Sequence, residues 1–130
     1  MKVVFCSSAI IKNKNGEILL MSRKQKESFV SFWEFPGGKL KNNENFAFAL
    51  FRELKEELNI KIDISKLSNY KFFKHQYRSF LLMMYVFEVN EWKGEITSKE
   101  GEQLRWVSEK KLKKAKLLPA NTKVINYFLK

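Results

Sequence analysis

The chain has 130 residues, of which 45% are hydrophobic and 15% aromatic, and its formal net charge is +11. This length and composition predict one domain over residues 1–130 with a buried core, and they exclude an intrinsically disordered protein. The longest apolar run, Phe80 to Phe87, is far shorter than a bilayer span, so we expect no membrane segment.

The positive charge comes from 21 lysines and 4 arginines that are spread over the whole chain. Scattered lysines are typical of a solvated positive surface, whereas specific recognition of phosphates and bases usually employs arginine. The net field favours an anionic partner. We therefore expect a general positive surface rather than a dedicated nucleic-acid patch, and no stable complex with a nucleic acid.

Cys6 is the only cysteine, so the chain can form no internal disulfide and no cysteine metal site. The apolar N-terminal segment lacks a signal-peptide pattern and is predicted to be a strand. We expect a cytoplasmic protein that acts as a monomer.

The first half of the chain contains two apolar β-type runs, a short extended segment and a helix. The runs at 3–12 and 17–23 flank Asn15-Gly16, a pair typical of hairpin turns because both positions tolerate positive φ. The extended segment at 31–35 ends at Pro36 and two glycines. The helix is expected between Asn45 as N-cap and Asn59 as a left-handed C-terminal residue. Its apolar stripe is Ala47, Leu50, Phe51, Leu54 and Leu58.

The second half predicts two strands, 70–77 and 79–89, joined near His75 to Ser79, and the second of them is apolar on both faces and therefore central. A last strand at 103–108 leads into a short basic helix that Ser108 could cap. The C-terminal segment has one apolar helical face. This irregular alternation predicts an α/β (α+β) fold in which helices pack on a mixed sheet.

Three carboxylates share one face of the predicted helix, because Glu56 and Glu57 lie three and four positions after Glu53. Like charges at this spacing destabilise a helix unless a cation neutralises them. Arg52 and Lys55 could neutralise them as part of a solvated helix face. Alternatively, an all-oxygen site of this kind would hold Mg²⁺ or Mn²⁺.

The spacing of the whole segment resembles the Nudix box, in which G, five residues, E and seven residues precede R-E-U-x-E-E-x-G-U, where U is apolar. Gly38, Glu44 and the run from Arg52 to Ile60 match eight of its nine specified positions. The departure is Asn59 in place of the final glycine, which a left-handed helix end tolerates. The segments "WEFPGGK", "KEGEQLRWV" and "LPAN" are similar to the MutT-type branch of this family, in the same order.

The resemblance implies a Nudix-type α/β/α sandwich with a central mixed sheet. It also implies a hydrolase in which Mg²⁺ assists the attack of water on a phosphoanhydride bond. The metal-binding residues would be the Gly37 carbonyl, Glu53, Glu56, Glu57 and Glu100, with Glu102 as the alternative to Glu100. The general base would be Glu53 or Glu100. Arg52 would orient a glutamate, and Glu44 would belong to the same charged network.

The MutT-type branch implies that the substrate base lies between the first strand, the aromatic residue before the "PGG" turn and a C-terminal asparagine. The corresponding substrate-binding residues are Val4, Cys6, Phe35, Gly38, Lys39 and Asn121. Asn121 could match the altered edge of 8-oxoguanine, or it could only cap the last helix. Arg23 could contact the substrate or form a surface salt bridge.

The expected activity is cleavage of 8-oxo-dGTP to the monophosphate and pyrophosphate, before the oxidised nucleotide is incorporated into DNA. One alternative is a Nudix hydrolase of pyrimidine triphosphates, dinucleoside polyphosphates or RNA 5′ ends. A second alternative, suggested by the charge, is a non-catalytic nucleic-acid-binding module. Phe46 and Phe48 flank the helical stripe, and one of them is expected to be exposed or to cover a neighbouring loop or a partner.

Overall fold

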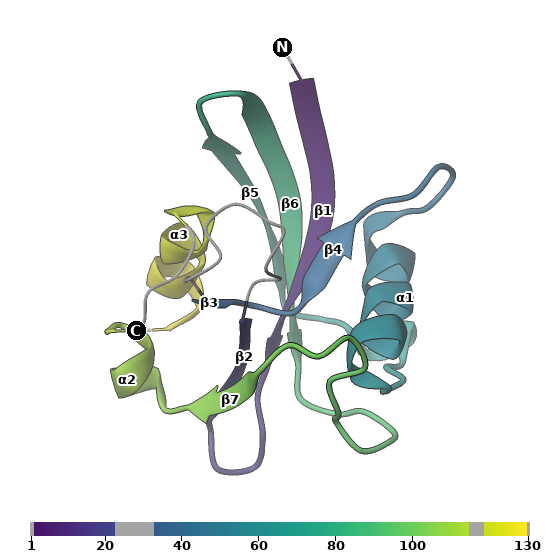
Figure 1. Ribbon diagram of the computed structural model, residues 1–130, viewed down its shortest axis with the longest axis vertical. Helices are drawn as coiled ribbons and strands as arrows, with labels where there is room; N and C mark the ends of the chain where they lie inside the picture. Colours follow the sequence, from purple (N-terminus) through teal and green to yellow (C-terminus); the bar gives the residue numbers. More distant parts are fainter. Residues whose placement is uncertain (1, 23–32, 115–118, 130) are drawn as a thin grey trace.

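A computed structural model describes residues 2–22, 33–114 and 119–129 of the chain (Figure 1). Its helices are α1 (Phe46–Leu58), α2 (Glu109–Leu112) and α3 (Pro119–Phe128), with a short 3₁₀ helix η1 (Ile64–Lys66). Its strands are β1 (Lys2–Ile11), β2 (Ile18–Ser22), β3 (Trp33–Glu34), β4 (Gly37–Lys39), β5 (Tyr70–Gln76), β6 (Phe80–Val89) and β7 (Leu104–Val107).

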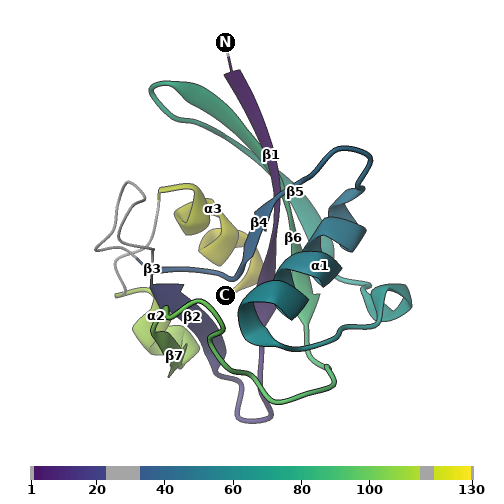
Figure 2. The same ribbon diagram turned by 45° about the vertical axis from the view of Figure 1, so that its right-hand side comes forward.

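The strands form two sheets, one in the order β4-β1-β6-β5 and one in the order β3-β2-β7. The larger sheet is mixed, because β1 and β6 run parallel while β4 and β5 pair antiparallel with their neighbours. Helix α1 lies on one side of this sheet and α3 on the other (Figures 1 and 2). The α/β/α sandwich with a mixed sheet is therefore confirmed, and β6 is an inner strand of that sheet, as predicted.

Alternation along β1 gives each helix its own hydrophobic core. Ala9 and Ile11 pack with the apolar stripe of α1, whereas Ile10 packs with α3 and α2 on the opposite side. All three side chains are fully buried. Successive side chains of a strand point to opposite faces, so every second residue of β1 serves a different layer.

The turn after β1 forms, but it joins strands of different sheets. Asn13 accepts two backbone N–H groups through its side chain, and Gly16 takes the positive φ of 78°. Within residues 2–22, the strand pairing between the two runs is limited to the bridge between Lys12 and Ile18. The expected hairpin is thus reduced to its turn, because β1 pairs with β6 and β4 while β2 pairs with β3 and β7.

Helix α1 has the predicted ends. The side chain of Asn45 accepts the N–H of Phe48 at 2.8 Å, and Asn59 adopts the left-handed conformation with φ 61°. Of the predicted apolar stripe, Leu50, Leu54 and Leu58 are buried while Ala47 and Phe51 are half-buried, and Ala49, which was not predicted, is buried as well.

The longest apolar run of the sequence forms strand β6 and no helix. Within residues 2–22, 33–114 and 119–129, no helix is long and apolar enough to cross a membrane.

Candidate active site

The acidic face of α1 points towards the strand that carries the two glycines. Glu57 is only 9% exposed, Glu53 is half-buried and Glu56 is exposed. The carboxylate of Glu57 accepts the N–H of Gly37 at 3.2 Å. The helix therefore places its three glutamates beside β4 at increasing depth, in the order Glu56, Glu53 and Glu57.

Arg52 holds four groups of this region together. Its Nε and Nη2 donate to the two carboxylate oxygens of Glu44, at 2.6 and 2.9 Å. Its Nη1 lies 2.8 Å from Glu53 and 3.3 Å from Glu56, and its Nη2 also donates to the carbonyl of Lys39. The forked bond from Arg52 lowers the pKa of Glu44 to about 2. Glu44 is therefore ionised at any physiological pH and fixes the guanidinium against the helix.

The glycines of β4 are required by space. A Cβ at Gly38 would lie 2.4 Å from the carboxyl carbon of Glu53, and one at Gly37 would lie 2.0 Å from the carbonyl oxygen of Ser7. Gly37 also has φ 150°, which L-residues rarely adopt. The two glycines thus belong to a strand of their own, β4. Because they have no side chain, the backbone of β4 can lie close to the carboxylate of Glu53.

Burial makes negative charge unfavourable on this face. Desolvation, followed by repulsion from Glu53, raises the pKa of Glu57 to about 9. Desolvation also raises the pKa of Glu53 and outweighs the opposing effect of Arg52, and repulsion from Glu56 and Glu100 adds smaller contributions in the same direction as desolvation. Crowded carboxylates that resist ionisation are stabilised as anions by a divalent cation, so the donor set fits a hard, oxygen-binding metal such as Mg²⁺.

The carboxylates are of the type that binds a divalent metal ion, but their side chains are not arranged around a metal position. Among the described residues, no group of three His, Cys, Asp or Glu side chains is already arranged to hold a metal ion. Arg52 holds Glu53 and Glu56 from one side, while Glu57 accepts the Gly37 N–H. A bound cation would compete with these bonds.

A cleft of about 640 Å³ lies between the acidic face and the start of α3. Of the predicted substrate-binding residues, it is lined by Val4, Cys6, Phe35, Gly38, Lys39 and Asn121. Glu53 and Glu57 line the same cleft. Arg23 lies outside the described residues. The structure therefore brings the predicted metal-binding face and the predicted base-binding residues into one volume.

The position of Asn121 tests one of its two predicted roles, that of an N-cap. Helix α3 begins at Pro119, so Asn121 lies inside the helix and not ahead of it. The N-cap alternative is wrong. Its side chain is 5% exposed and lines the cleft, beside Cys6, whose thiol pKa burial raises to about 12. That thiol stays protonated and can act as a weak hydrogen-bond donor or acceptor.

Glu100 and Glu102 occupy different surroundings. Glu100 is exposed and does not line the cleft, yet it is close enough to raise the pKa values of Glu53 and Glu57. Glu102 is buried and lines the cleft, and neither of its carboxylate oxygens has a hydrogen-bond partner among the described residues.

Several residues that line the cleft were missed in the sequence, among them one carboxylate and an aromatic pair. Glu34 raises the pKa of both Cys6 and Glu57, and Tyr77 and Phe80 stack with ring centres 4.9 Å apart at the turn between β5 and β6. Glu34 stands inside "WEFPGGK" and could have been found by its place beside Phe35. The aromatic pair had no signal, because only the pairing of β5 with β6 brings it to α3.

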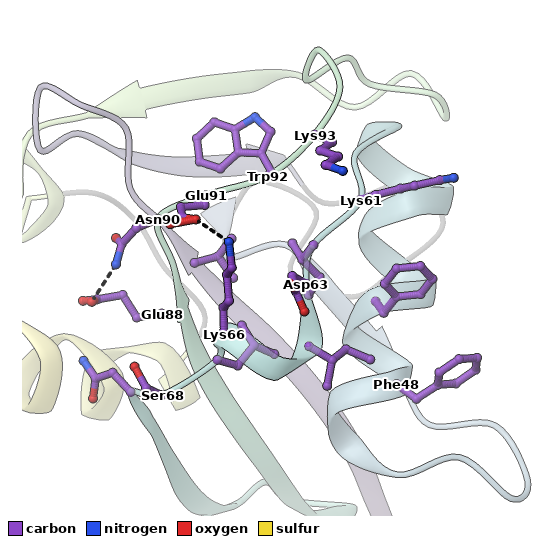
Figure 3. A pocket seen from close by; sticks show the side chains of 16 residues that line it. Phe48, Lys61, Asp63, Lys66, Ser68, Glu88, Asn90, Glu91, Trp92 and Lys93 are labelled. Atoms are coloured by element: carbon purple, nitrogen blue, oxygen red, sulfur yellow. Dashed lines mark hydrogen bonds and ion pairs between the residues drawn. The ribbon is translucent and has the colours of Figure 1, made fainter.

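A second hollow, of about 760 Å³, lies on the far side of α1 and is shown in Figure 3. Its acidic groups are already engaged: Asp63 caps η1, Glu91 pairs with Lys66 and Glu88 pairs with Lys12. None of the glutamates of the α1 acidic face lines it. The larger hollow is therefore not where the acidic chemistry lies.

The model of the NUDIX domain matches residues 6–128. The chain belongs to the NUDIX domain family. It is 35% identical over 128 residues to the 8-oxo-dGTP diphosphatase of Haemophilus influenzae, covering 98% of this chain and 93% of that protein. It is 28% identical to the CTP pyrophosphohydrolase of Escherichia coli, covering 99% and 93%.

The fold is shared with solved structures of the same family. The solution structure of the E. coli ORF135 protein matches with a TM-score of 0.84 and 28% identity, over 99% of this chain and 90% of that one. The protein is therefore a Nudix hydrolase that acts on phosphoanhydride bonds, similar to the MutT-type enzymes. Nudix hydrolases generally need a divalent metal ion, usually Mg²⁺.

Proposed function

We propose that this Nudix hydrolase is a Mg²⁺-dependent, MutT-type pyrophosphohydrolase that cleaves 8-oxo-dGTP to 8-oxo-dGMP and pyrophosphate. The observation that carries the proposal is the shared cleft, which is lined both by Glu53 and Glu57 and by the buried Asn121. The relative from H. influenzae, named as an 8-oxo-dGTP diphosphatase, supports this substrate.

The metal-binding residues we propose are Glu53, Glu56, Glu57, Glu100 and the Gly37 carbonyl. When bound there, Mg²⁺ would neutralise phosphate oxygens and make a water molecule more acidic. Lys39 lines the cleft beside these groups and adds positive charge for the polyphosphate.

Glu53 is the side chain we assign to accept the proton of the attacking water. Glu53 lines the cleft on the face proposed to hold the metal, and a carboxylate within reach of the attacking water can take its proton. Arg52 holds Glu53 in place and is itself held by Glu44. By analogy with the MutT-type branch, water would attack the β-phosphorus.

Base selection would depend on hydrogen bonding in a buried pocket. 8-Oxoguanine has an N7–H donor and an O8 acceptor where guanine has only the N7 acceptor, and an amide such as Asn121 both donates and accepts. Leaving a buried polar group unpaired costs about 1–3 kcal/mol, enough for roughly 10- to 100-fold discrimination. Phe35, which is almost fully buried, would form an apolar wall of the pocket.

A second candidate substrate is a pyrimidine triphosphate, because the CTP pyrophosphohydrolase of E. coli is similar over almost the whole chain. The test is a panel of 8-oxo-dGTP, dGTP, CTP, dCTP and a dinucleoside polyphosphate, each with Mg²⁺ and with detection of pyrophosphate and phosphate. We expect the highest kcat/KM for 8-oxo-dGTP and pyrophosphate as its product. A kcat/KM for 8-oxo-dGTP no higher than for dGTP refutes the proposal, and a preference for CTP selects the second candidate.

A further inference from the structure

One end of the larger sheet projects past both helices (Figures 1 and 2). One side of this end belongs to the cleft, because Val4, Cys6, Phe80 and Leu82 line it. The intervening residues of β1, such as Val3 and Phe5, point to the other side. That side is covered by α1 only from Ser7 onward, where the Ser7 hydroxyl donates to the carbonyl of Phe46.

The uncovered side carries a continuous group of rings, the aromatic face, which consists of Phe5, Phe46, Tyr70, Phe72 and Tyr85. Phe46 contacts Phe5 and Tyr85 with ring centres 6.3 and 4.7 Å apart. Tyr85 contacts Phe72 at 5.2 Å and Tyr70 at 6.1 Å. The rings therefore run without a break from β1 across the start of α1 and β6 to β5.

Much of this aromatic face is accessible to solvent. Phe5 is 47% exposed, Tyr70 53% and Phe72 38%, and Val3 beside them is 40% exposed. Isolated exposed apolar residues are ordinary, but a contiguous patch on several elements marks an interaction site. The substrate cleft makes no use of these side chains, since none of them lines it.

The charge around the aromatic face has one sign. Residues 2–16 and 64–87, which include all of β1 and β5 and nearly all of β6, contain no aspartate or glutamate. Lys74 lies two positions after Phe72 in β5, so both side chains stand on the same side of the sheet, and Lys74 is exposed. Arg78 is exposed in the turn that follows β5. The surface therefore combines open rings with the positive charge of Lys74 and Arg78.

We propose that the aromatic face binds a single-stranded nucleic acid, with bases against Phe5, Tyr70 and Phe72 and with phosphates near Lys74 and Arg78. Exposed rings next to lysine and arginine are the combination that holds single strands, because every base has a face that can stack. A duplex buries those faces in its own stack. A second copy of this chain fits less well, since each copy carries a net charge of +11.

The proposal goes beyond the proposed function and revises the expectation of no stable nucleic-acid partner. That expectation followed from the lysine-rich composition. The aromatic face adds stacking, which the order of residues along the chain does not reveal, because its rings come from four separate elements.

The test is fluorescence anisotropy of a labelled 12-nucleotide single strand, titrated with the full chain at two salt concentrations and without Mg²⁺. We expect saturable binding that weakens with salt. The double variant Phe5→Ala/Phe72→Ala should weaken it at least tenfold, and Lys74→Glu should weaken it as well. Phe48→Ala is the matched control, because Phe48 is 49% exposed but stacks on Phe51 outside the aromatic face.

Two further measurements test the proposal. The first separates base stacking from binding by charge alone, and the second separates a nucleic-acid strand from a second copy of the chain as the partner. An abasic strand of equal length, or a duplex, should bind more weakly than the single strand; equal binding overturns the proposal. A dimer in light scattering that Phe5→Ala/Phe72→Ala dissociates, without strand binding, would assign the face to a second copy instead. Unchanged hydrolysis of the preferred nucleotide by that variant, with an unchanged circular dichroism spectrum, shows that its fold and cleft are intact.

Discussion

The phenol oxygen of Tyr77 accepts the backbone N–H of Ala120 at 3.1 Å and so ties the turn after β5 to the first turn of α3. The first N–H groups of a helix have no partner within the helix, so a side chain from another element satisfies one of them here. The next residue of α3 is Asn121. The hydrogen bond therefore helps to fix the position of the start of α3, and with it the position of the Asn121 side chain in the cleft.

Tyr77→Phe keeps the stacking on Phe80 and removes only this hydroxyl. We expect the free energy of unfolding to fall by about 0.5–1.5 kcal/mol. The KM for 8-oxo-dGTP should rise more than kcat falls, because the base-binding end of the cleft is loosened. Tyr127→Phe is the control on an exposed tyrosine of α3. Equal effects of the two variants on KM would show that the hydroxyl of Tyr77 has no special role.

Glu53→Gln tests the assignment of the proton acceptor. The amide has nearly the shape of the carboxylate but cannot take the proton, so kcat should fall by about 10²–10⁴. The thermal midpoint should not fall, since desolvation already disfavours the negative charge of Glu53. Glu95→Gln, on an exposed loop residue, is the control. A kcat within threefold of the unmodified enzyme removes Glu53 from the chemical step.

Asn121→Ala should narrow the preference for 8-oxo-dGTP over dGTP by roughly tenfold or more, because the buried amide can no longer pair with the altered base edge. The ratio of the two kcat/KM values is the measurement. Asn126→Ala is the matched control, since Asn126 is exposed on the same helix. An unchanged ratio would leave Asn121 with a purely structural part in α3.

The burial of Glu57 predicts a pH-dependent stability in the absence of divalent cations. Its pKa is raised to about 9 in the folded protein from an ordinary value of 4.5. Between these values the unfolded chain gives up a proton that the folded chain keeps. The free energy of unfolding should therefore fall as the pH rises from about 4.5 to 9, by at most about 1.4 kcal/mol per pH unit.

Urea unfolding in EDTA at pH 5, 6, 7 and 8 measures this slope, and Glu57→Gln should flatten it. The slope from Glu44 has the opposite sign and lies below pH 4.5, because its pKa is lowered to about 2. Excess Mg²⁺ should stabilise the protein more at pH 8 than at pH 5, since the cation requires ionised carboxylates. The same slope in the variant as in the parent chain would contradict this account.

Glu100→Gln and Glu102→Gln separate the two candidates for the last carboxylate of the metal site. Glu100 lies close enough to Glu53 and Glu57 to raise their pKa values, so its variant should raise the Mg²⁺ concentration needed for half-maximal activity several-fold. Glu102 is buried and has no hydrogen-bond partner within residues 2–22, 33–114 and 119–129, so its variant should stabilise the metal-free protein. Calorimetric titration with Mg²⁺ gives a readout besides turnover. The reverse pattern would transfer the metal role to Glu102.

The features that could be predicted from the sequence are the local ones. The caps of α1 at Asn45 and Asn59 and the common face of Glu53, Glu56 and Glu57 depend only on spacing within a helix. The central position of β6 followed from its apolar character on both faces. The family pattern added the residues of the cleft, which lie far apart in the chain and meet only in the fold.

The features that could not be predicted depend on contacts between distant segments. Nothing local indicates that β1 and β2 join different sheets, because their turn has the geometry of an ordinary hairpin. The N-cap alternative for Asn121 failed because α3 begins two residues earlier, at Pro119. The burial of Glu102 and the approach of Tyr77 to α3 are likewise set by tertiary packing.

In β1, Val4 and Cys6 line the cleft on one face of the sheet, and Val3 and Phe5 lie on the opposite face. Point substitutions can therefore alter one surface and spare the other. Deletion or insertion of one residue within 3–6 cannot spare either surface, because a shift of one residue moves side chains of this strand to the opposite face of the sheet. Natural variants of this strand should accordingly differ by replacement and keep their length.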